Sequence, residues 1–206
     1  MKTICVTAQK GGAGKTTLAR NLAVAASQDG QRAVLIDLDP QQSLRGWWDS
    51  READEPAMLA TDPAPHQLAH ALIRLAEDFD LCVIDTPPAA PDWLAEAITL
   101  ADLALVPVRP SADDLRAVGA TIAALERAGT PFAFVLSQAP RAKLTDQTVR
   151  ALARHGRIAP ENIAQRVAYA ETAGSGQGVC ETNDSKARAE MAGIWSYVRE
   201  LTEARA

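Results

Sequence analysis

The sequence predicts a doubly wound α/β fold, in which helices cover both faces of a mostly parallel sheet. Short apolar runs alternate with longer segments of helical periodicity, and each longer segment can serve as a crossover between parallel strands. The apolar runs are nearly continuous, which indicates strands that are buried on both faces. Together, these two observations are typical of a layered α/β domain.

Five strands are expected, at residues 3–7, 33–38, 81–84, 103–108 and 132–136. Helices are expected at residues 16–29, 66–78, 92–100, 113–128, 145–155 and 186–204. Gly30 stands where it can end the first helix, whereas Thr145 can begin the fifth and Gly156 can end it. Residues 51–65 are expected to form an irregular connection or a weak helix.

Length and composition favour one domain over residues 1–206, because a chain of 206 residues can enclose a single core. A hydrophobic content of 47% excludes a disordered chain.

No apolar run approaches the length of about 20 residues that spans a bilayer, and the N-terminus leads directly into a strand, so we expect a cytoplasmic protein. The net charge of −5 excludes a surface that is basic throughout, so any nucleic-acid contact must be local.

A glycine-rich segment connects the first expected strand to the first expected helix. It comprises Lys10, Gly11, Gly12, Ala13, Gly14, Lys15, Thr16 and Thr17. Glycines at such a turn let backbone N–H groups approach phosphate oxygens, and the helix N-terminus favours negative charge. Lys15 would contact the β- and γ-phosphates, and the Thr16 hydroxyl would bind Mg²⁺. We therefore expect ATP and Mg²⁺ as cofactors and hydrolysis of the γ-phosphate.

Acidic residues follow two of the expected strands. Asp37 and Asp39 are two residues apart, which places both carboxylates on one face of an extended segment. Asp85 ends an apolar strand at the carboxyl edge of the sheet, where ligands bind in doubly wound folds. Carboxylates gathered at this edge indicate a cation or a water to be held there, although Asp39 with Pro40 would also suit a simple turn.

The segment from Lys10 to Thr17 resembles the deviant Walker A motif of the ParA/MinD family of ATPases, in which a second lysine precedes the glycines. The general P-loop pattern has a glycine where this chain has Gln9, so the match is to the deviant form. Residues 106–115 are similar to the strand, loop and helix that follow Walker B in the family. Residues 165–167 and 171–178 look like its late loop at the edge of the nucleotide.

This resemblance implies a role for each site residue. Lys10 would reach the nucleotide of the partner in an ATP-bound homodimer, and Lys15 the nucleotide of its own subunit. Asp37 would assist the magnesium shell, Asp39 would position the attacking water, and Asp85 would hold Mg²⁺ through water. The resemblance also places two residues near the adenine base, namely Gln138 and Arg166.

Residues 39–44 with Trp47 resemble the small plasmid-partition ParA proteins, which lack an N-terminal DNA-binding domain, and because a strand is expected from Thr3 we expect none in this chain. Such proteins bind DNA non-specifically as ATP dimers and are stimulated by a centromere-binding, ParB-like partner. The resemblance therefore implies partition of plasmid or other cargo by a cytoplasmic, nucleoid-associated protein.

The residues that we expect to contact DNA lie in one basic stretch. They are Arg141, Lys143, Arg150, Arg154 and Arg157. These five positive charges against one acid, Asp146, give a net charge of +4, and Arg150 and Arg154 are expected to share a helix face. Phosphate contacts from this face would be independent of sequence and sensitive to salt. A solvated helix surface explains the same residues about equally well.

Other branches of the family fit less well. The last eight residues, 199–206, balance two arginines against two glutamates, so they lack the basic tail with which MinD binds membrane, and no membrane partner is expected. The related iron protein of nitrogenase needs paired cysteines at a dimer interface, whereas Cys5 and Cys82 lie inside expected strands. A MinD-like positioning ATPase for another cargo and a metabolic ATP-dependent enzyme without DNA binding remain as alternatives.

Overall fold

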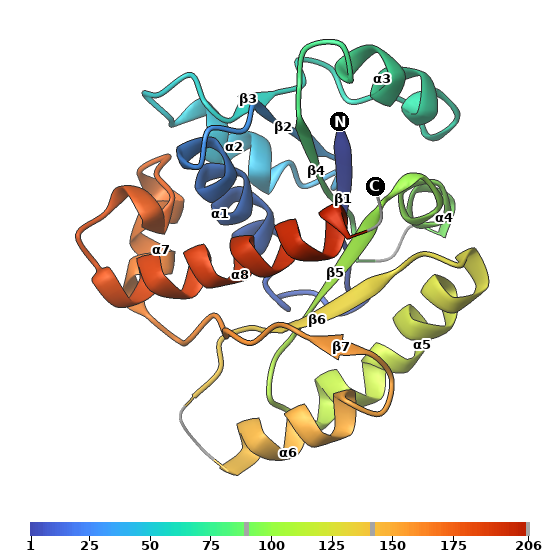
Figure 1. Cartoon of the computed structure of the whole chain (residues 1–206), viewed down its shortest axis with the longest axis vertical. Coiled ribbons are helices and arrows are strands. Elements are labelled where there is room, and N and C mark those ends of the chain that lie inside the picture. The colour runs from blue at the N-terminus through green and yellow to red at the C-terminus, as the bar shows by residue number, and fades with distance from the viewer. Residues whose placement is uncertain (89–90, 141–142, 205–206) are drawn as a thin grey trace.

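The computed structural model of the chain describes residues 1–88, 91–140 and 143–204 (Figure 1). Its strands are β1 (Lys2–Val6), β2 (Ala33–Asp37), β3 (Ala57–Met58), β4 (Leu81–Asp85), β5 (Leu103–Val108), β6 (Phe132–Leu136) and β7 (Arg157–Ile158). Its α-helices are α1 (Lys15–Gln28), α2 (Ser43–Asp49), α3 (Leu68–Leu75), α4 (Pro91–Leu100), α5 (Ala112–Ala128), α6 (Lys143–Leu152), α7 (Val167–Gly174) and α8 (Ser185–Glu203). Two 3₁₀ turns are η1 (Pro65–Gln67) and η2 (Val179–Glu181).

The described strands form one parallel sheet in the order β3-β2-β4-β1-β5-β6-β7. From β1 the chain crosses through α1 to β2 on one side of the sheet, whereas from β4 it crosses through α4 to β5 on the other side. In the register, Asp85 lies beside both Val6 and Asp37. The carboxyl ends of β1, β2 and β4 therefore meet at the point where ligands bind in open α/β sheets.

Two apolar cores lie on the two faces of the sheet, because alternate strand residues point to opposite faces. Ile4 and Val6 of β1 pack with α1 and α8, whereas Cys5 packs with helices α3 to α6. Figure 1 shows α8 running beside α1 across the near face of the sheet, and these two helices are in contact. No helix in the described residues combines the length and the apolar character that a membrane span needs.

The predicted fold class is confirmed, and each of the five predicted strands exists with ends that differ from the prediction by at most one residue. Gly30 follows α1 with φ of 86°, as expected of a residue that ends a helix. Two short α-helices and two strands were not predicted, namely α2, α7 and the two-residue edge strands β3 and β7. β3 falls within residues 51–65, which were expected to form an irregular connection or a weak helix.

The predicted bounds of α6 are wrong. The helix begins at Lys143 rather than at Thr145, and the Thr145 hydroxyl donates to the Pro140 carbonyl from inside the first turn. It ends at Leu152, four residues before Gly156. Gly156 instead lies against β6, where an added Cβ would collide with the ring of Phe132. The glycine signal therefore marked a close approach of two segments and not the helix end.

Candidate nucleotide-binding site

The glycine-rich loop lies between β1 and α1, as predicted. Gly12 and Gly14 adopt φ values of 73° and 100°, a left-handed conformation that L side chains rarely adopt. At Gly14 an added Cβ would also overlap the Ser137 hydroxyl, at a separation well under 3.0 Å. Glycine is therefore required here both by the backbone conformation and by the close approach of the loop after β6.

Lys15 begins α1 and is 7% exposed. Burial lowers the pKa of its ammonium, and the carboxylates of Asp85 and Asp39 oppose this shift. Two acids thus face the lysine across the site. A buried cation at a helix N-terminus next to exposed backbone N–H groups is the arrangement that binds an anionic phosphate chain.

Thr16 and Asp85 form the second part of the site. The Thr16 hydroxyl donates to Asp85 Oδ2 at 2.6 Å, whereas Asp85 Oδ1 is buried without a hydrogen-bond partner. Burial raises the pKa of Asp85 to about 7, and the Thr16 hydroxyl and Lys15 oppose that rise. A buried carboxylate oxygen with no partner beside a threonine hydroxyl fits a divalent cation, because Mg²⁺ typically uses one or two protein oxygens together with water and phosphate. Among the described residues, no group of three His, Cys, Asp or Glu side chains is arranged to hold a metal ion by itself.

Asp37 ends β2 and Asp39 follows it, but their environments differ. Asp37 is buried, and its two oxygens accept the backbone N–H groups of Asp39, Leu44 and Arg45 at 3.0 Å. Asp37 therefore anchors the start of α2 as well as facing Asp85. Asp39 is half-buried and lines the cavity beside the glycine-rich loop, where its Oδ1 accepts Gln41 N–H. That bond orients the carboxylate that the sequence assigns to the attacking water.

The Lys10 side chain does not join Lys15, the other lysine of its loop, and instead binds an acid on α5. Its Nζ lies 2.7 Å from Asp114 Oδ2, and the carboxylate of Asp114 also accepts from Arg109 and Ser111. Burial would raise the pKa of Asp114, but the bonds from Arg109, Lys10 and Ser111 outweigh it and lower this pKa to about 2. The Lys10 side chain is 31% exposed, so its ammonium lies near the surface. Asp114 was not recognised from the sequence, although Ser111 three residues earlier is a helix-capping signal for α5.

A cavity of about 950 Å³ lies at the carboxyl edge of the sheet and is lined by the glycine-rich loop, Lys15, Thr16 and Asp39. This volume falls in the range of about 300–1,000 Å³ that is typical of small-molecule sites. Both predicted base contacts line it. Gln138 has φ of 51° and donates from Nε2 to the Gly12 carbonyl at 3.2 Å, so it lies over the loop. The guanidinium of Arg166 is paired with Glu190 of α8 at 2.5 Å, which leaves its backbone and its aliphatic stem for the cavity.

The predicted DNA contacts do not share one helix face. Lys143 and Arg150 lie on α6, Arg154 lies in the turn after it, and Arg157 lies on β7, whereas Arg141 is outside the described residues. The expected pairing of Arg150 with Arg154 on one helix face is wrong, because the chain leaves the helix after Leu152.

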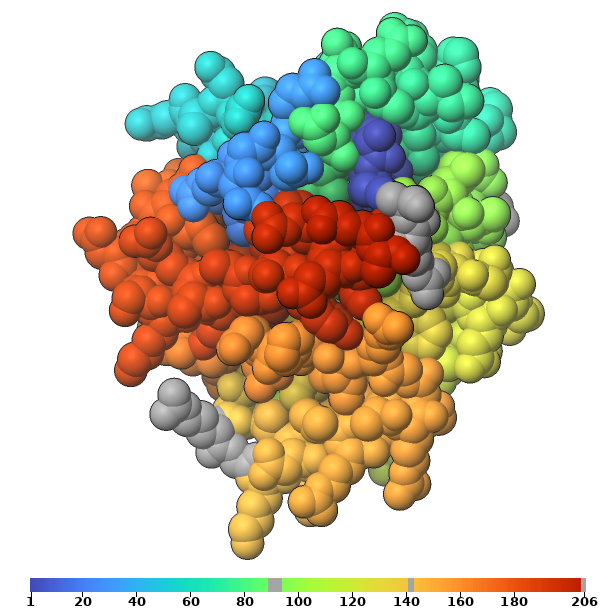
Figure 2. Space-filling model, in the orientation of Figure 1, coloured from blue at the N-terminus to red at the C-terminus, as the bar shows by residue number. Residues whose placement is uncertain are grey.

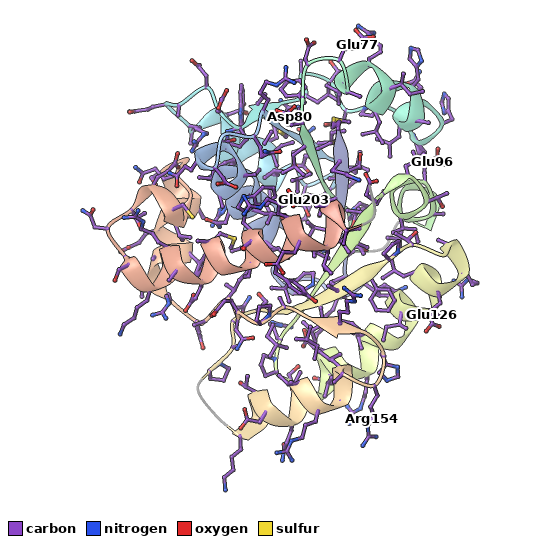
Figure 3. The ribbon with its side chains drawn as sticks, viewed as in Figure 1. Glu77, Asp80, Glu96, Glu126, Arg154 and Glu203 are labelled. Carbon is purple, nitrogen blue, oxygen red and sulfur yellow. The ribbon has the colours of Figure 1, made fainter. Side chains whose placement is uncertain are left out.

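These four arginine and lysine residues are nevertheless exposed, and none forms an ion pair with another described residue. Figure 2 shows α6 and the turn after it at one end of the molecule, away from α3. Figure 3 places Arg154 at this end and Glu77 and Asp80 at the opposite one. The cations are therefore free to meet polyanions at one end of the molecule.

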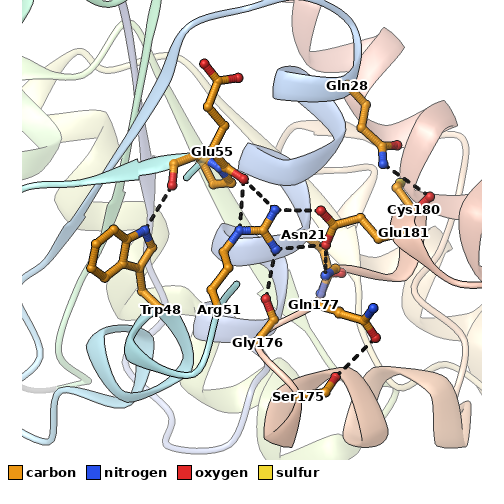
Figure 4. A network of polar contacts seen from close by, with 12 residues as sticks. Asn21, Gln28, Trp48, Arg51, Glu55, Ser175, Gly176, Gln177, Cys180 and Glu181 are labelled. Atoms are coloured by element: carbon orange, nitrogen blue, oxygen red, sulfur yellow. Dashed lines mark hydrogen bonds and ion pairs between the residues drawn. The ribbon is translucent and has the colours of Figure 1, made fainter. Parts of the chain in front are cut away.

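An ion pair that was not predicted connects Arg51, which follows α2, to the segment between α7 and α8 (Figure 4). Arg51 donates to both oxygens of Glu181, at 2.8 and 2.5 Å, and to the Gly176 carbonyl at 2.8 Å. Asn21 of α1 accepts Val179 N–H beside it at 2.7 Å. The partners are 125 to 158 residues apart in sequence, so no local pattern could have revealed them.

Comparison with known proteins identifies the family of the chain. A family model described as the CobQ/CobB/MinD/ParA nucleotide binding domain matches residues 4–179. The maintenance of carboxysome distribution protein A of Halothiobacillus neapolitanus is 34% identical over 186 residues, which cover 81% of each chain. The chromosome-partitioning ATPase Soj of Thermus thermophilus is 31% identical over 159 residues, which cover 63% of this chain and 64% of Soj.

Among solved structures, the septum site-determining protein MinD of Pyrococcus horikoshii, complexed with Mg-ADP, has the same fold. Its TM-score is 0.81 at 18% identity, and the match covers 100% of this chain and 98% of that one. The ligand of that relative agrees with the ATP and Mg²⁺ expected from the sequence. The glycine-rich loop, the two lysines and the match over residues 4–179 show that the chain belongs to the CobQ/CobB/MinD/ParA family of nucleotide-binding ATPases.

Proposed function

We propose that the chain is a ParA-type ATPase that uses Mg-ATP to form a homodimer, binds DNA non-specifically and positions a cargo. One observation carries the proposal: the side chains of the two lysines in a single loop point toward different groups. Lys15 is buried and faces Asp85 and Asp39, whereas Lys10 leaves the loop toward Asp114 and remains 31% exposed. A second lysine that is not used by its own site is available to the nucleotide of a partner subunit.

The residues of this chain divide the chemistry among them. The backbone N–H groups of residues 11–16 and the ammonium of Lys15 bind the phosphates, and Thr16 with Asp85 would hold Mg²⁺, assisted by Asp37. Mg²⁺, when bound, supplies positive charge that neutralises the phosphate oxygens. Asp39, held by the Gln41 N–H, orients the water that attacks the γ-phosphate.

Lys10 tests the dimeric part of the proposal. For it to act in trans, its ammonium must leave Asp114 and approach the phosphates of the partner subunit, where it neutralises charge in the transition state. Lys10→Ala is therefore expected to keep ADP affinity and to lose ATP turnover by about 10²-fold or more. Lys186→Ala removes an exposed lysine of α8 and serves as the matched control. Unchanged turnover of Lys10→Ala, measured by phosphate release, would refute the role in trans.

The exposed cations at the α6 end support non-specific DNA binding. Phosphate contacts depend on released counterions, so retention of random-sequence DNA should be stronger with ATP than with ADP and should fall steeply with salt. Arg150→Ala with Arg154→Ala should weaken retention and leave ATP turnover intact. The control pair, Arg74→Ala with Arg188→Ala, removes the same amount of positive charge as the test pair, but from α3 and α8. A mobility shift that is equal with ATP and ADP would favour a metabolic ATP-dependent enzyme instead.

The cargo is proposed to be a plasmid or another large body, recruited through a centromere-binding, ParB-like protein at the nucleoid. A second candidate cargo follows from a relative that matches 81% of this chain. That relative is named for carboxysome distribution. The two candidates differ in what stimulates ATP hydrolysis. A partner that stimulates only when it is bound to a specific DNA site supports plasmid partition, whereas a partner that stimulates without DNA supports a protein cargo.

A further inference from the structure

One arginine of α1 lines the cavity beside the glycine-rich loop without the partner that a buried cation needs. Arg20 of α1 is 4% exposed, although arginine is rarely buried unless it is paired. Its Nη2 donates to the carbonyl of Tyr169 in α7 at 2.5 Å, and its Nε is buried with no hydrogen-bond partner. No carboxylate of the described residues forms an ion pair with it.

Burial lowers the pKa of Arg20 to about 10, so the guanidinium is still charged at neutral pH. A charge that is buried without a counter-ion lowers stability, and proteins normally offset that cost with an ion pair or a charged ligand. Tyr169 supplies one neutral carbonyl, which satisfies one donor of a group that carries five. The guanidinium therefore has both unused donors and unbalanced charge.

The position of Arg20 indicates which part of a ligand it would meet. Arg20 follows Thr16 by four residues and Thr17 by three, so its side chain lies on the same face of α1 as theirs. All three residues line the same cavity. On the side of α7 the cavity is lined by Tyr169, Ala170 and Ala173, and Arg20 is bonded to the first of them. A nucleotide whose terminal phosphates occupy the glycine-rich loop would extend from Thr16 toward α7. Arg20, which lies one turn after Thr16 and contacts α7, would then be next to the α-phosphate of such a ligand.

We propose that Arg20 is a further nucleotide-binding residue that recognises the α-phosphate and connects it to α7 through the Tyr169 carbonyl. The inference rests on the proposed adenine-nucleotide function and adds a contact that the glycine-rich motif does not contain. Because the guanidinium both balances the phosphate charge and holds α7, bound nucleotide stabilises the wall that closes the cavity. A nucleoside, which carries no phosphate, gains no affinity from this residue.

The test compares adenosine, AMP and ADP, each titrated with Mg²⁺ against the full chain by equilibrium dialysis. Arg20→Gln keeps a donor for the Tyr169 carbonyl and removes the charge, whereas Arg20→Lys keeps the charge. Arg20→Gln should weaken AMP and ADP binding by about 10- to 100-fold and leave adenosine binding unchanged. Arg20→Lys should recover part of that loss. Arg74→Gln, on the exposed face of α3, is the matched control and should bind all three ligands like the wild type.

The ratio of AMP to adenosine affinity separates ligand recognition from a purely structural role, which would change both affinities alike. Urea unfolding of each variant shows that it is folded at the titration temperature. Wild-type affinity of Arg20→Gln for AMP and ADP would overturn the inference alone, and so would equal losses for adenosine and ADP. Failure of the wild-type chain to bind ADP would overturn the proposed function and the inference with it.

Discussion

The ion pair between Arg51 and Glu181 should contribute strongly to stability, because it is largely buried and joins segments that are distant in sequence. The Arg51 side chain is 4% exposed and that of Glu181 is 22% exposed. In Arg51→Met, the carboxylate of Glu181 keeps only the Gly178 N–H, and the Gly176 carbonyl loses its side-chain donor. Breaking a buried pair from one side costs about 3–5 kcal/mol, and we expect the lower end, about 3 kcal/mol, because Glu181 is partly exposed. For a chain of this size that loss lowers Tm by about 6–12 °C.

A double-mutant cycle by urea unfolding measures the pair itself. The combined variant Arg51→Met/Glu181→Leu should lose less stability than the sum of its single variants, by about 1 kcal/mol or more. The exposed pair of Arg32 and Asp80, with side chains 58% and 39% exposed, provides the control, and Arg32→Met should cost less than about 1 kcal/mol. Additive losses at positions 51 and 181, or a cost for Arg51→Met as small as that of the control, would show that the pair does not stabilise the fold.

The same pair predicts a dependence on pH. Burial would raise the pKa of Glu181, but the Arg51 guanidinium and the Gly178 N–H outweigh it and lower this pKa below its ordinary value. A carboxyl whose pKa is lower in the folded state stabilises the fold above its unfolded pKa and loses that contribution as the pH falls through the folded one. The stability difference between wild type and Arg51→Met should therefore be full at pH 7 and shrink at acid pH. A difference that grows on acidification would contradict the assigned charges.

Three further substitutions test the site. Gly14→Ala should weaken ADP binding by about 10-fold or more, because the residue has φ of 100° and a Cβ would overlap Ser137; Gly30→Ala, which meets open space, should leave ADP affinity unchanged, and equal affinity in both variants would contradict this account. Asp85→Asn should abolish the effect of Mg²⁺ on ATP binding but should not lower Tm at pH 8 without ligand, because it removes a buried charge; a lower Tm would count against the stated burial cost. Asp39→Ala should bind ATP yet stop its hydrolysis and so accumulate an ATP dimer, and normal phosphate release would exclude Asp39 from the mechanism.

The parts of this structure that were predictable are those with a local signal. The sheet could be predicted because each of its longer strands is a continuous apolar run. The glycine-rich loop could be recognised because the backbone conformation at Gly12 and Gly14 requires glycine, which leaves a visible pattern in the sequence. Asp85 followed from its place at the end of a strand. Edge strands of two residues, such as β3, have no period to detect, and their existence depends on a neighbour strand that is distant in sequence.

The parts that were missed depend on contacts between distant segments. The partner of Lys10 lies 104 residues away, and the carbonyl that binds Arg20 lies 149 residues away. Arg20 looks in sequence like one polar position of an ordinary helix, and only its burial against α7 sets it apart. The expectation that Arg150 and Arg154 share a helix face was wrong for a related reason: the pattern of charges was taken for a helix that continued past Leu152, whereas packing of Gly156 on β6 draws the chain away.

Lys15 is proposed to hold a magnesium–adenine nucleotide at the glycine-rich loop. Titration of ATP into the purified chain, with Mg²⁺ and with EDTA, examines this contact when Lys15→Ala is measured beside the wild type. Binding to the wild type should be saturable and stronger with Mg²⁺, and Lys15→Ala should lose it. ATP that fails to bind in the presence of Mg²⁺, or that binds equally well to Lys15→Ala, would rule this contact out.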